Sequence, residues 1–456
     1  MKTSILAKLK MATDIPPEIT TPDHNLEICG KVNRVKMLTI SLAMAFVALA
    51  SNVNVSAQST GAPSQPQTFA DRLTYNRAIE AAIWSRPFTA VKALMDGLQR
   101  DAGVGYNDIG YFSQLQNSKF KWPTTNVTTP YVIAYWNAEK EPVVVEIPPA
   151  TPDVSVFGLL ADSWQRWIAD VGPGGVDGGR GAKYLLTTPE YRGPVPPGYI
   201  LLQQTTYNGY MSLRPVLKDN SAASLQKAVE YVKQIKIYPL SQVNNPPTRY
   251  IDLYDKKVNL VSRLDADMYR ELDAMIQIER IEERDLVAMG MLQSLGIEKG
   301  KPFAPSDKMV AMFAAAAKET QDFLRQGYLF DDSRIYYPGT QWRVAATPGL
   351  VETRFTFLYP GFVDTVNRAL LYNYIWGSIE RVGTASWYIN LAADGKGQPL
   401  DGSRNYRLKV PANAPVTQFW SATTQSDENG EYMDVSGRLA LASTDQGVVK
   451  TADGSV

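Results

Sequence analysis

The feature that most constrains the fold is a series of short segments, rich in β-branched and aromatic residues, between residues 120 and 215. The segments are 131–136, 143–147, 154–160, 184–187, 199–205 and 210–215. Pro, Gly and Asp separate them, and each is shorter than an ordinary helix. This pattern is typical of short strands joined by turns, so we expect a small β-sandwich here.

Helical periodicity occurs on both sides of this region. Between residues 69 and 99 apolar residues recur at helical spacing, and we expect Pro87 to divide the segment into two helices. A polar helix is expected at 222–236 and a longer amphipathic one at 265–295, whose methionines we interpret as core residues because their spacing is that of a buried face. Ser306 is expected to cap the next helix.

From residue 331 onward strands return, interrupted by one predicted helix at 364–374. The predicted strands are 334–337, 342–345, 353–358, 385–391, 405–410 and 417–424. Residues 394–397 and 427–430 have the composition of hairpin turns. The chain stops at residue 456 where another strand is expected, so we predict that the C-terminal domain is truncated.

The distribution of His and Cys limits the chemistry. The 456-residue chain has one of each, His24 and Cys29, and both precede residue 57. Beyond that point the sequence excludes Ser-His-Asp catalysis, His- or Cys-ligated zinc or haem, and a structural disulfide. Carboxylate, Tyr, Lys, Arg and hydroxyl groups remain, and no metal or cofactor is predicted.

Overall charge gives little reason to expect a nucleic-acid partner. Lys and Arg together number 46, and Asp and Glu also number 46. Without residues 1–57 the chain would keep 40 basic and 42 acidic residues. A nucleic-acid-binding protein carries a basic excess that is missing here. With 45% hydrophobic and 20% charged residues, a globular protein of two or three domains is expected.

Residues 37–50, MLTISLAMAFVALA, have the length and composition of the apolar core of a signal peptide. Lys31, Arg34 and Lys36 precede the run, and the small residues that a cleavage site requires end at Ala57. We predict cleavage after Ala57 and a periplasmic or secreted protein without a membrane span. The alternative is an uncleaved N-terminal anchor, although about 20 apolar residues are needed to cross a bilayer.

Several blocks of sequence together resemble a bacterial family that pairs domain of unknown function 1254 with domain of unknown function 1214. The blocks are TTNVTTPYVIAYWN with EPVVVEIPP (124–149), GPGGVDGGRGAKYLLTTPEYRGPVPPGYI (172–200), GIEKGKPFAP (296–305), WYINLAADGKGQPLDGSRNYRLKVPANAPVTQFWSATT (387–424) and GVVKTADGSV (447–456). The family often has Asp where this chain has Thr128, so a carboxylate role there is not expected.

The resemblance implies a mainly β fold with a helical insert: an immunoglobulin-like β-sandwich, a small helical domain and a C-terminal jelly roll. The expected division is 1–57 leader, 58–119 linker and helices, 120–240 sandwich, 262–330 helical domain and 331–456 incomplete jelly roll. The family name assigns no activity.

Three groups of residues are candidate ligand contacts. Aromatic side chains at strand ends stack on sugar rings in many proteins, although such residues also fill sandwich cores. The aromatic candidates are Tyr131, Tyr135, Trp136 and Trp387.

The glycine-rich stretch 172–181 matches no phosphate-binding motif, and we interpret it as a loop or wide hairpin. Asp177, Arg180 and Lys183 are expected to project from that loop.

Asp364, Arg368 and Tyr372 form the third group, on one predicted helix. Carboxylate, guanidinium and phenol groups can carry acid–base chemistry without imidazole. The alternative is an ion pair between Asp364 and Arg368, which lie one turn apart.

A dense charge cluster lies in the predicted 265–295 helix. It contains Glu279, Arg280, Glu282, Glu283 and Arg284. Because di-iron bundles need Glu-x-x-His motifs, we interpret this cluster as a solvated helix face with local ion pairs.

Three functions therefore stay open. The first is an exported protein that binds a small molecule or saccharide in an aromatic-lined cleft between domains. The second is a hydrolase or lyase that uses Asp or Glu with Tyr, Arg or Lys. The third is an envelope structural or assembly protein whose sheet faces form a homo-oligomer.

Overall fold

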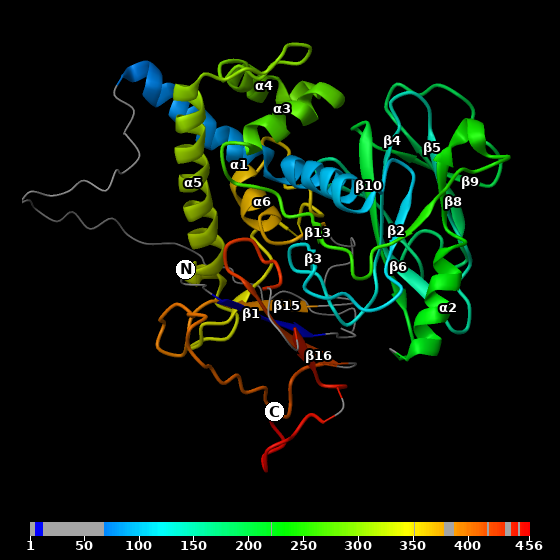
Figure 1. The fold of residues 1–456 in the computed structure, drawn as a ribbon, viewed down its shortest axis with the longest axis vertical. Helices are drawn as coiled ribbons and strands as arrows, with labels where there is room; N and C mark the ends of the chain where they lie inside the picture. The colour runs from blue at the N-terminus through cyan, green and yellow to red at the C-terminus, as the bar shows by residue number, and fades with distance from the viewer. Residues whose placement is uncertain are drawn as a thin grey trace, which may run out of the picture.

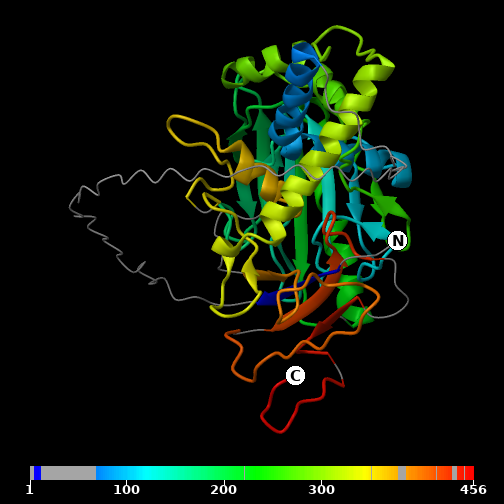
Figure 2. The same cartoon turned by 90° about the vertical axis from the view of Figure 1, so that its left-hand side faces the viewer.

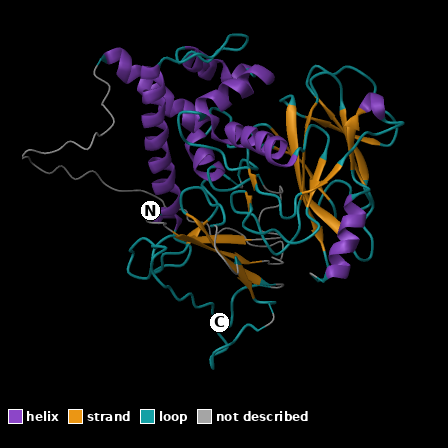
Figure 3. Cartoon of the chain, viewed as in Figure 1, coloured by secondary structure: helices purple, strands orange, loops and turns teal. Residues whose placement is uncertain are grey.

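The structure is a computed structural model. It describes residues 5–11, 68–219, 221–350, 352–377, 387–416, 419–433, 439–445 and 447–456. The described chain is β-rich, and a group of helices lies beside the larger set of strands (Figures 1 and 3). Figure 2 shows these helices in the upper part of the view and the C-terminal segments in the lower part.

Two sheets form the first part of the fold. The six-stranded sheet has the order β12 (Tyr250–Asp252), β2 (Ile109–Tyr111), β4 (Val132–Asn137), β10 (Asn208–Val216), β6 (Ser155–Asp162) and β7 (Trp167–Val171). The four-stranded sheet has the order β11 (Lys236–Pro239), β5 (Val143–Ile147), β8 (Ala182–Thr187) and β9 (Tyr199–Gln203). The six segments predicted between 120 and 215 are all strands, because their β-branched and aromatic residues suit the half-buried or buried surface of a sheet.

The two sheets share one hydrophobic core, to which α2 (Ala222–Val232) also contributes. Trp136, Tyr184 and Met211 are fully buried in it. Each side chain of this size contributes roughly 2 to 3 kcal/mol through the apolar surface that it buries. This core fixes the frame from which the loops of the first part project.

The helical part is built around α1 (Phe69–Gly97), which continues into the single π-helical turn η1 (Leu98–Ala102). The predicted division at Pro87 is wrong, because this proline lies inside one continuous helix. Pro costs one backbone hydrogen bond there. Residues 81–91 are buried without interruption, so packing on the neighbouring elements outweighs that cost.

The predicted helix 265–295 is also wrong as a single element. It consists of α3 (Met268–Ile278), a break, the 3₁₀ turn η3 (Glu283–Asp285) and α4 (Leu286–Gln293). Glu279 adopts an extended backbone at the break. The prediction that its methionines belong to the core is confirmed at Met268 and Met275, which are fully buried.

The next helix, α5 (Asp307–Leu329), begins as predicted, since the Ser306 hydroxyl accepts a bond from the Met309 amide. Two short elements flank the helical part: β3 (Phe120–Lys121) pairs with β13 (Val258–Asn259) in parallel. The 3₁₀ turns η2 (Leu240–Gln242) and η4 (Asp332–Arg334) complete the connections. No helix among the described residues is long and apolar enough to cross a membrane.

The C-terminal part contains α6 (Thr365–Tyr372) and a five-stranded sheet. Its order is β14 (Arg343–Val344), β15 (Trp387–Leu391), β1 (Ile5–Met11), β16 (Trp420–Ser426) and β17 (Ala440–Ala442). The strand β1 comes from the predicted leader and pairs antiparallel with both β15 and β16.

Three predicted strands in this part are wrong. Residues 353–358 and 405–410 form turns or irregular chain, and residues 334–337 form the end of η4, one isolated bridge at Ile335 and a bend. At the first, the Thr353 hydroxyl donates to the Gly349 carbonyl and accepts from the Phe357 amide, at 2.7 and 2.8 Å. Such side-chain bonds compete with the ladder of a sheet.

Candidate functional site

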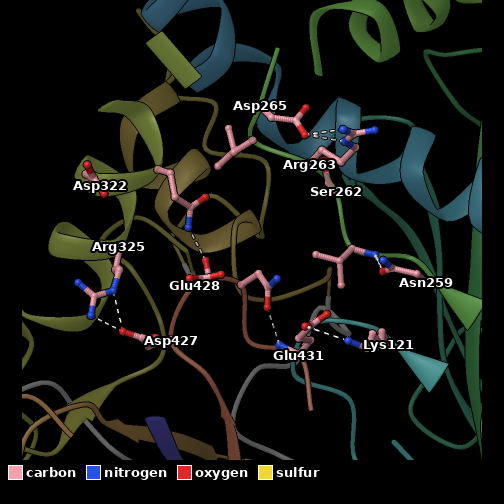
Figure 4. A pocket seen from close by; sticks show the side chains of 14 residues that line it. Lys121, Asn259, Ser262, Arg263, Asp265, Asp322, Arg325, Asp427, Glu428 and Glu431 are labelled. Atoms are coloured by element: carbon pink, nitrogen blue, oxygen red, sulfur yellow. Dashed lines mark hydrogen bonds and ion pairs between the residues drawn. The ribbon is translucent and has the colours of Figure 1, made fainter. Parts of the chain in front are cut away.

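A cavity of about 640 Å³ lies where the sheet, helical and C-terminal parts meet. Figure 4 shows its lining side chains, which come from segments far apart in sequence. Lys121 forms part of one wall, and α5 contributes Gln321, Asp322 and Arg325. The remaining residues lie in two segments, 259–265, called the strap below, and 427–431, called the clamp turn.

Hydrogen bonds tie the clamp turn to α5 and to the end of α6. The Arg325 guanidinium donates to the buried Asp427 carboxylate, with Nε at 2.7 Å from Oδ2. The Gln321 side chain donates to the Glu428 carbonyl, and the Tyr374 hydroxyl donates to the Asp427 carbonyl at 2.8 Å. One wall of the cavity is therefore fastened to another.

The clamp turn also contacts the first part of the fold. The Thr124 amide donates to the Gly430 carbonyl at 2.9 Å, and Lys121 pairs with Glu431 at 3.3 Å. Gly430 has a φ of +72°, and a Cβ there would lie 3.1 Å from Thr124. Glycine is therefore favoured by the backbone conformation, and a larger residue would also be tight against the Thr124 side chain.

The strap is held from its buried side by Arg86 of α1, which is 2% exposed. Its guanidinium donates to the Ser262 hydroxyl and carbonyl, both at 3.0 Å, and to the Arg263 carbonyl at 2.9 Å. Burial lowers the pKa of Arg86 to about 10, which leaves it charged at neutral pH. A buried cation thus positions one wall of the cavity.

Glu271 of α3 lies near this guanidinium. Burial raises the pKa of its carboxyl to about 7, against the opposing effect of Arg86 and Arg263. Its Oε2 atom is buried and has no hydrogen-bond partner among the described residues. Glu271 therefore changes charge near neutral pH, and it lies near the guanidinium that holds the strap.

The lining is polar and slightly acidic. Of its fourteen residues, three are basic and five are acidic, and none is aromatic. Each of the three basic residues is ion-paired with an acidic residue of the same lining. Amide and hydroxyl groups of Asn259, Ser262, Gln321 and Asn429 fill much of the rest. Such a surface can exchange several hydrogen bonds with a hydroxyl-rich molecule.

The structure places the predicted aromatic candidates in cores. Tyr131 and Tyr135 are 3% exposed, and Trp136 is completely buried. The Tyr135 hydroxyl donates to the Val104 carbonyl at 2.8 Å, and the Trp136 indole donates to Gln204 at 2.9 Å. Their polar atoms are thus used within the fold.

The side chains of the three residues predicted to project from the glycine-rich loop have different surroundings, although the Arg180 amide donates to the Asp177 carbonyl at 3.0 Å. Asp177 is buried and accepts from the Gly172 amide at 2.8 Å, which closes the loop between β7 and β8. Arg180 is exposed on that loop. Lys183 lies on β8, 3.9 Å from Glu146 across the ladder.

The helix candidates are partly brought together. Arg368 is buried, its guanidinium donates to the Trp84 carbonyl at 2.7 Å and it lies 5.0 Å from the Trp164 ring centroid. The Tyr372 hydroxyl donates to the Phe355 carbonyl at 2.9 Å. Asp364 instead caps α6 through the Asn367 amide, so the predicted Asp364–Arg368 pair does not form. The Trp387 side chain lies outside the described residues.

A buried polar cluster was missed in the 265–295 segment, where the predicted solvated face is wrong. Glu279 is 1% exposed and accepts from the Ser163 hydroxyl at 2.5 Å and from the Tyr207 and Asn208 amides at 2.7 and 2.9 Å. These donors belong to the sheet part, so the interaction pins the α3 end there. Burial raises the pKa of Glu279.

Arg166 extends the same cluster. It donates to Asp162 at 2.6 Å and to Glu282 at 2.7 Å. Burial alone would lower the pKa of Arg166, but the two carboxylates outweigh that effect and raise it. No lining residue of the cavity belongs to this cluster, which joins the sheet and helical parts.

Comparisons with known families match the sheet part and the C-terminal part of the chain separately. Residues 106–239 match the model of a protein of unknown function, DUF1254, and residues 385–456 match that of a protein of unknown function, DUF1214. The chain therefore carries both domains in the predicted order, which confirms the resemblance.

Over most of its length the chain is similar to a solved structure, the crystal structure of the VPA0106 protein from Vibrio parahaemolyticus. The two share 16% identity and a TM-score of 0.51, over 84% of this chain and 86% of that one. At this identity the likeness concerns the fold alone.

An uncharacterised protein from Burkholderia cenocepacia is 11% identical, with a TM-score of 0.22, over 56% of this chain and 58% of that one, which does not indicate a shared fold. None of the curated proteins compared with the chain matches it.

Proposed function

We propose that this is an exported protein that binds a small, hydroxyl-rich molecule, a saccharide in the first instance, in the cavity between its three parts. The observation that carries the proposal is the cavity itself. Its volume of about 640 Å³ lies within the range of sites for small molecules. Its amide, hydroxyl and ion-paired groups offer donors and acceptors in close alternation.

The leader supports the compartment in this proposal, and its cleavage after Ala57 would remove β1 from between β15 and β16. Residues 31–57 have the charged, apolar and small-residue segments of a signal peptide in the correct order. In the same proposal, the two sheets that share a core form an immunoglobulin-like sandwich, and the C-terminal sheet belongs to a jelly roll.

The lining favours binding over hydrolysis. Four of its five carboxylates are paired with a basic side chain: Asp427, Glu431 and Asp265 with residues of the lining, and Asp322 with Lys318 of α5. A catalytic pair of carboxylates instead needs one member in the protonated form. The aromatic surfaces that commonly stack on sugars are missing from the lining, so recognition would rest on hydrogen bonds.

A thermal-shift screen tests the proposal. The purified protein is compared with Gln321→Trp, which fills the cavity, and with Gln326→Trp, a matched change at an exposed position of the same helix outside the lining. At ten times Kd we expect a saccharide to raise Tm by about 2 °C in the parent and in Gln326→Trp. The same saccharide should leave Gln321→Trp unchanged.

Two outcomes would contradict the proposal. One is that neutral saccharides, amino sugars and sugar acids all leave Tm unchanged in the parent protein. The other is that a saccharide stabilises Gln321→Trp as strongly as Gln326→Trp, which would place the site elsewhere.

A further inference from the structure

The base of the strap contains two buried atoms that lack hydrogen bonds. These are Nε of Arg86 and Oε2 of Glu271, and neither has a partner among the described residues. Buried polar atoms of this kind normally find a partner. The two belong to groups of opposite charge that influence each other's pKa without forming a hydrogen bond or ion pair in the structure described. An unused donor and an unused acceptor therefore lie in the same buried region.

In the geometry described, Arg86 directs its other donors to the strap. Its Nη atoms make three bonds, to the Ser262 hydroxyl, the Ser262 carbonyl and the Arg263 carbonyl. All three acceptors are neutral. A bond from a guanidinium to a carboxylate is roughly twice as strong as a bond between neutral groups. An ionised Glu271 would therefore compete with the strap for Arg86.

We propose that Glu271 and Arg86 form a proton-sensitive switch that sets the position of the strap, and with it the shape of the cavity. When Glu271 is protonated, Arg86 holds Ser262 and Arg263. When Glu271 is ionised, it draws the guanidinium toward itself, and the strap loosens. This switch goes beyond ligand binding, since it acts on the cavity wall whether or not a ligand is present.

Other charged groups face Glu271 from the elements around it. They are Lys92, Asp96 and Arg100 from the α1 region and Arg263 from the strap itself. Lys92 is paired with Asp96 at 2.5 Å, and Arg263 with Asp265 at 2.6 Å. Arg100 is 60% exposed, so water screens it. Arg86 remains the buried cation, and the pKa of about 7 for Glu271 places its change of charge near neutrality.

A single fluorescent label on the strap tests the switch. Replacing Cys29, the one cysteine of the chain, by Ser allows Val261→Cys to be labelled alone with bimane in the full chain. Val261 lines the cavity beside Ser262. We expect a shift in emission with a midpoint at about pH 7. Adding Glu271→Gln should abolish that transition, and the matched control Glu283→Gln should retain it.

The switch is contradicted by a label that reports no transition between about pH 5.5 and 8.5, a range that brackets the ionisation of Glu271. It is also contradicted by the same transition in Glu271→Gln. Hydrogen exchange of the unsubstituted chain provides a second measurement that needs no variant to fold. After correction for intrinsic rates, strap amides should lose protection about fivefold at pH 8 relative to pH 6, while β5 amides stay unchanged. Equal strap protection at both pH values would overturn the proposal.

Discussion

Two glutamates associated with the same helix show how differently a carboxylate with a buried oxygen can be used. Glu279 ends α3 and accepts hydrogen bonds from Ser163, Tyr207 and Asn208 of the sheet part. Glu271, two turns earlier, has a buried oxygen with no partner among the described residues. Donors surround the first, so it fixes one domain against another. The second retains a free acceptor beside Arg86, so its charge can act on the strap.

The largest effect is expected from Glu279→Ala. This change leaves several buried donors of the sheet part without an acceptor. Unsatisfied buried groups cost about 1 to 3 kcal/mol each, and breaking a buried polar network costs 3 to 5 kcal/mol, roughly. We expect a loss of about 4 kcal/mol in the free energy of unfolding, measured in urea. A loss no greater than that of the control Glu283→Ala, at an exposed position, would show that the network is dispensable.

Glu271→Gln sharpens the contrast through pH. The folded-state pKa of Glu271, about 7, lies above its ordinary value of 4.5. Its stability contribution is therefore fully present below pH 4.5 and is lost as pH rises through 7. Glutamine does not ionise, so the variant should match the parent near pH 4 and be more stable at pH 8, by up to about 3 kcal/mol. Urea midpoints across this range provide the measurement. Parallel pH profiles would refute the assignment.

The clamp turn predicts an intermediate effect. Asp427→Asn removes a buried carboxylate that accepts from Arg325, whose side chain is 30% exposed. Because water can reach the remaining guanidinium, we expect a loss of about 1 to 2 kcal/mol rather than the full penalty of a buried charge. Hydrogen exchange should increase at residues 426–432 more than in β5. Increased exchange in β5 alone would show that the clamp turn is held by other contacts.

The smallest effect is expected at an exposed residue of the strap. Arg263 is 51% exposed and pairs with Asp265 and Asp267. Exposed pairs contribute about 0 to 1 kcal/mol and are weakened by salt. Arg263→Ala should therefore change the free energy of unfolding by about 0.5 kcal/mol or less, and by still less in about 1 M salt. A larger, salt-independent loss would mean that its side chain supports the strap by packing.

The strands of the first part could be predicted because their signal is local. Residues 143–147 have the composition of a buried strand, which can be recognised without knowing their surroundings, and β5 has these bounds. The positions at which helices break or continue were harder to predict from the sequence. Pro87 is tolerated inside α1 because a buried environment holds both sides of it. Glu279 ends α3 because donors more than 70 residues away capture its carboxylate.

A cleft between domains was predicted, but none of the residues that line the cavity was, since its walls meet only in the folded chain. Lys121, the strap, α5 and the clamp turn carry no common motif. One signal was present: residues 427–430 were identified as a turn, and polar turns often carry binding residues. The aromatic candidates pointed elsewhere because Tyr131, Tyr135 and Trp136 fill cores. Residue type alone cannot separate a stacking surface from a packed interior.

A crystal structure grown with the tightest-binding saccharide of the screen tests the central claim most directly. We expect the saccharide to lie between the strap, Gln321 of α5 and the clamp turn, with hydrogen bonds to their amide, hydroxyl or carboxylate groups. A saccharide bound outside this cavity, with the cavity itself free of it, would contradict the account.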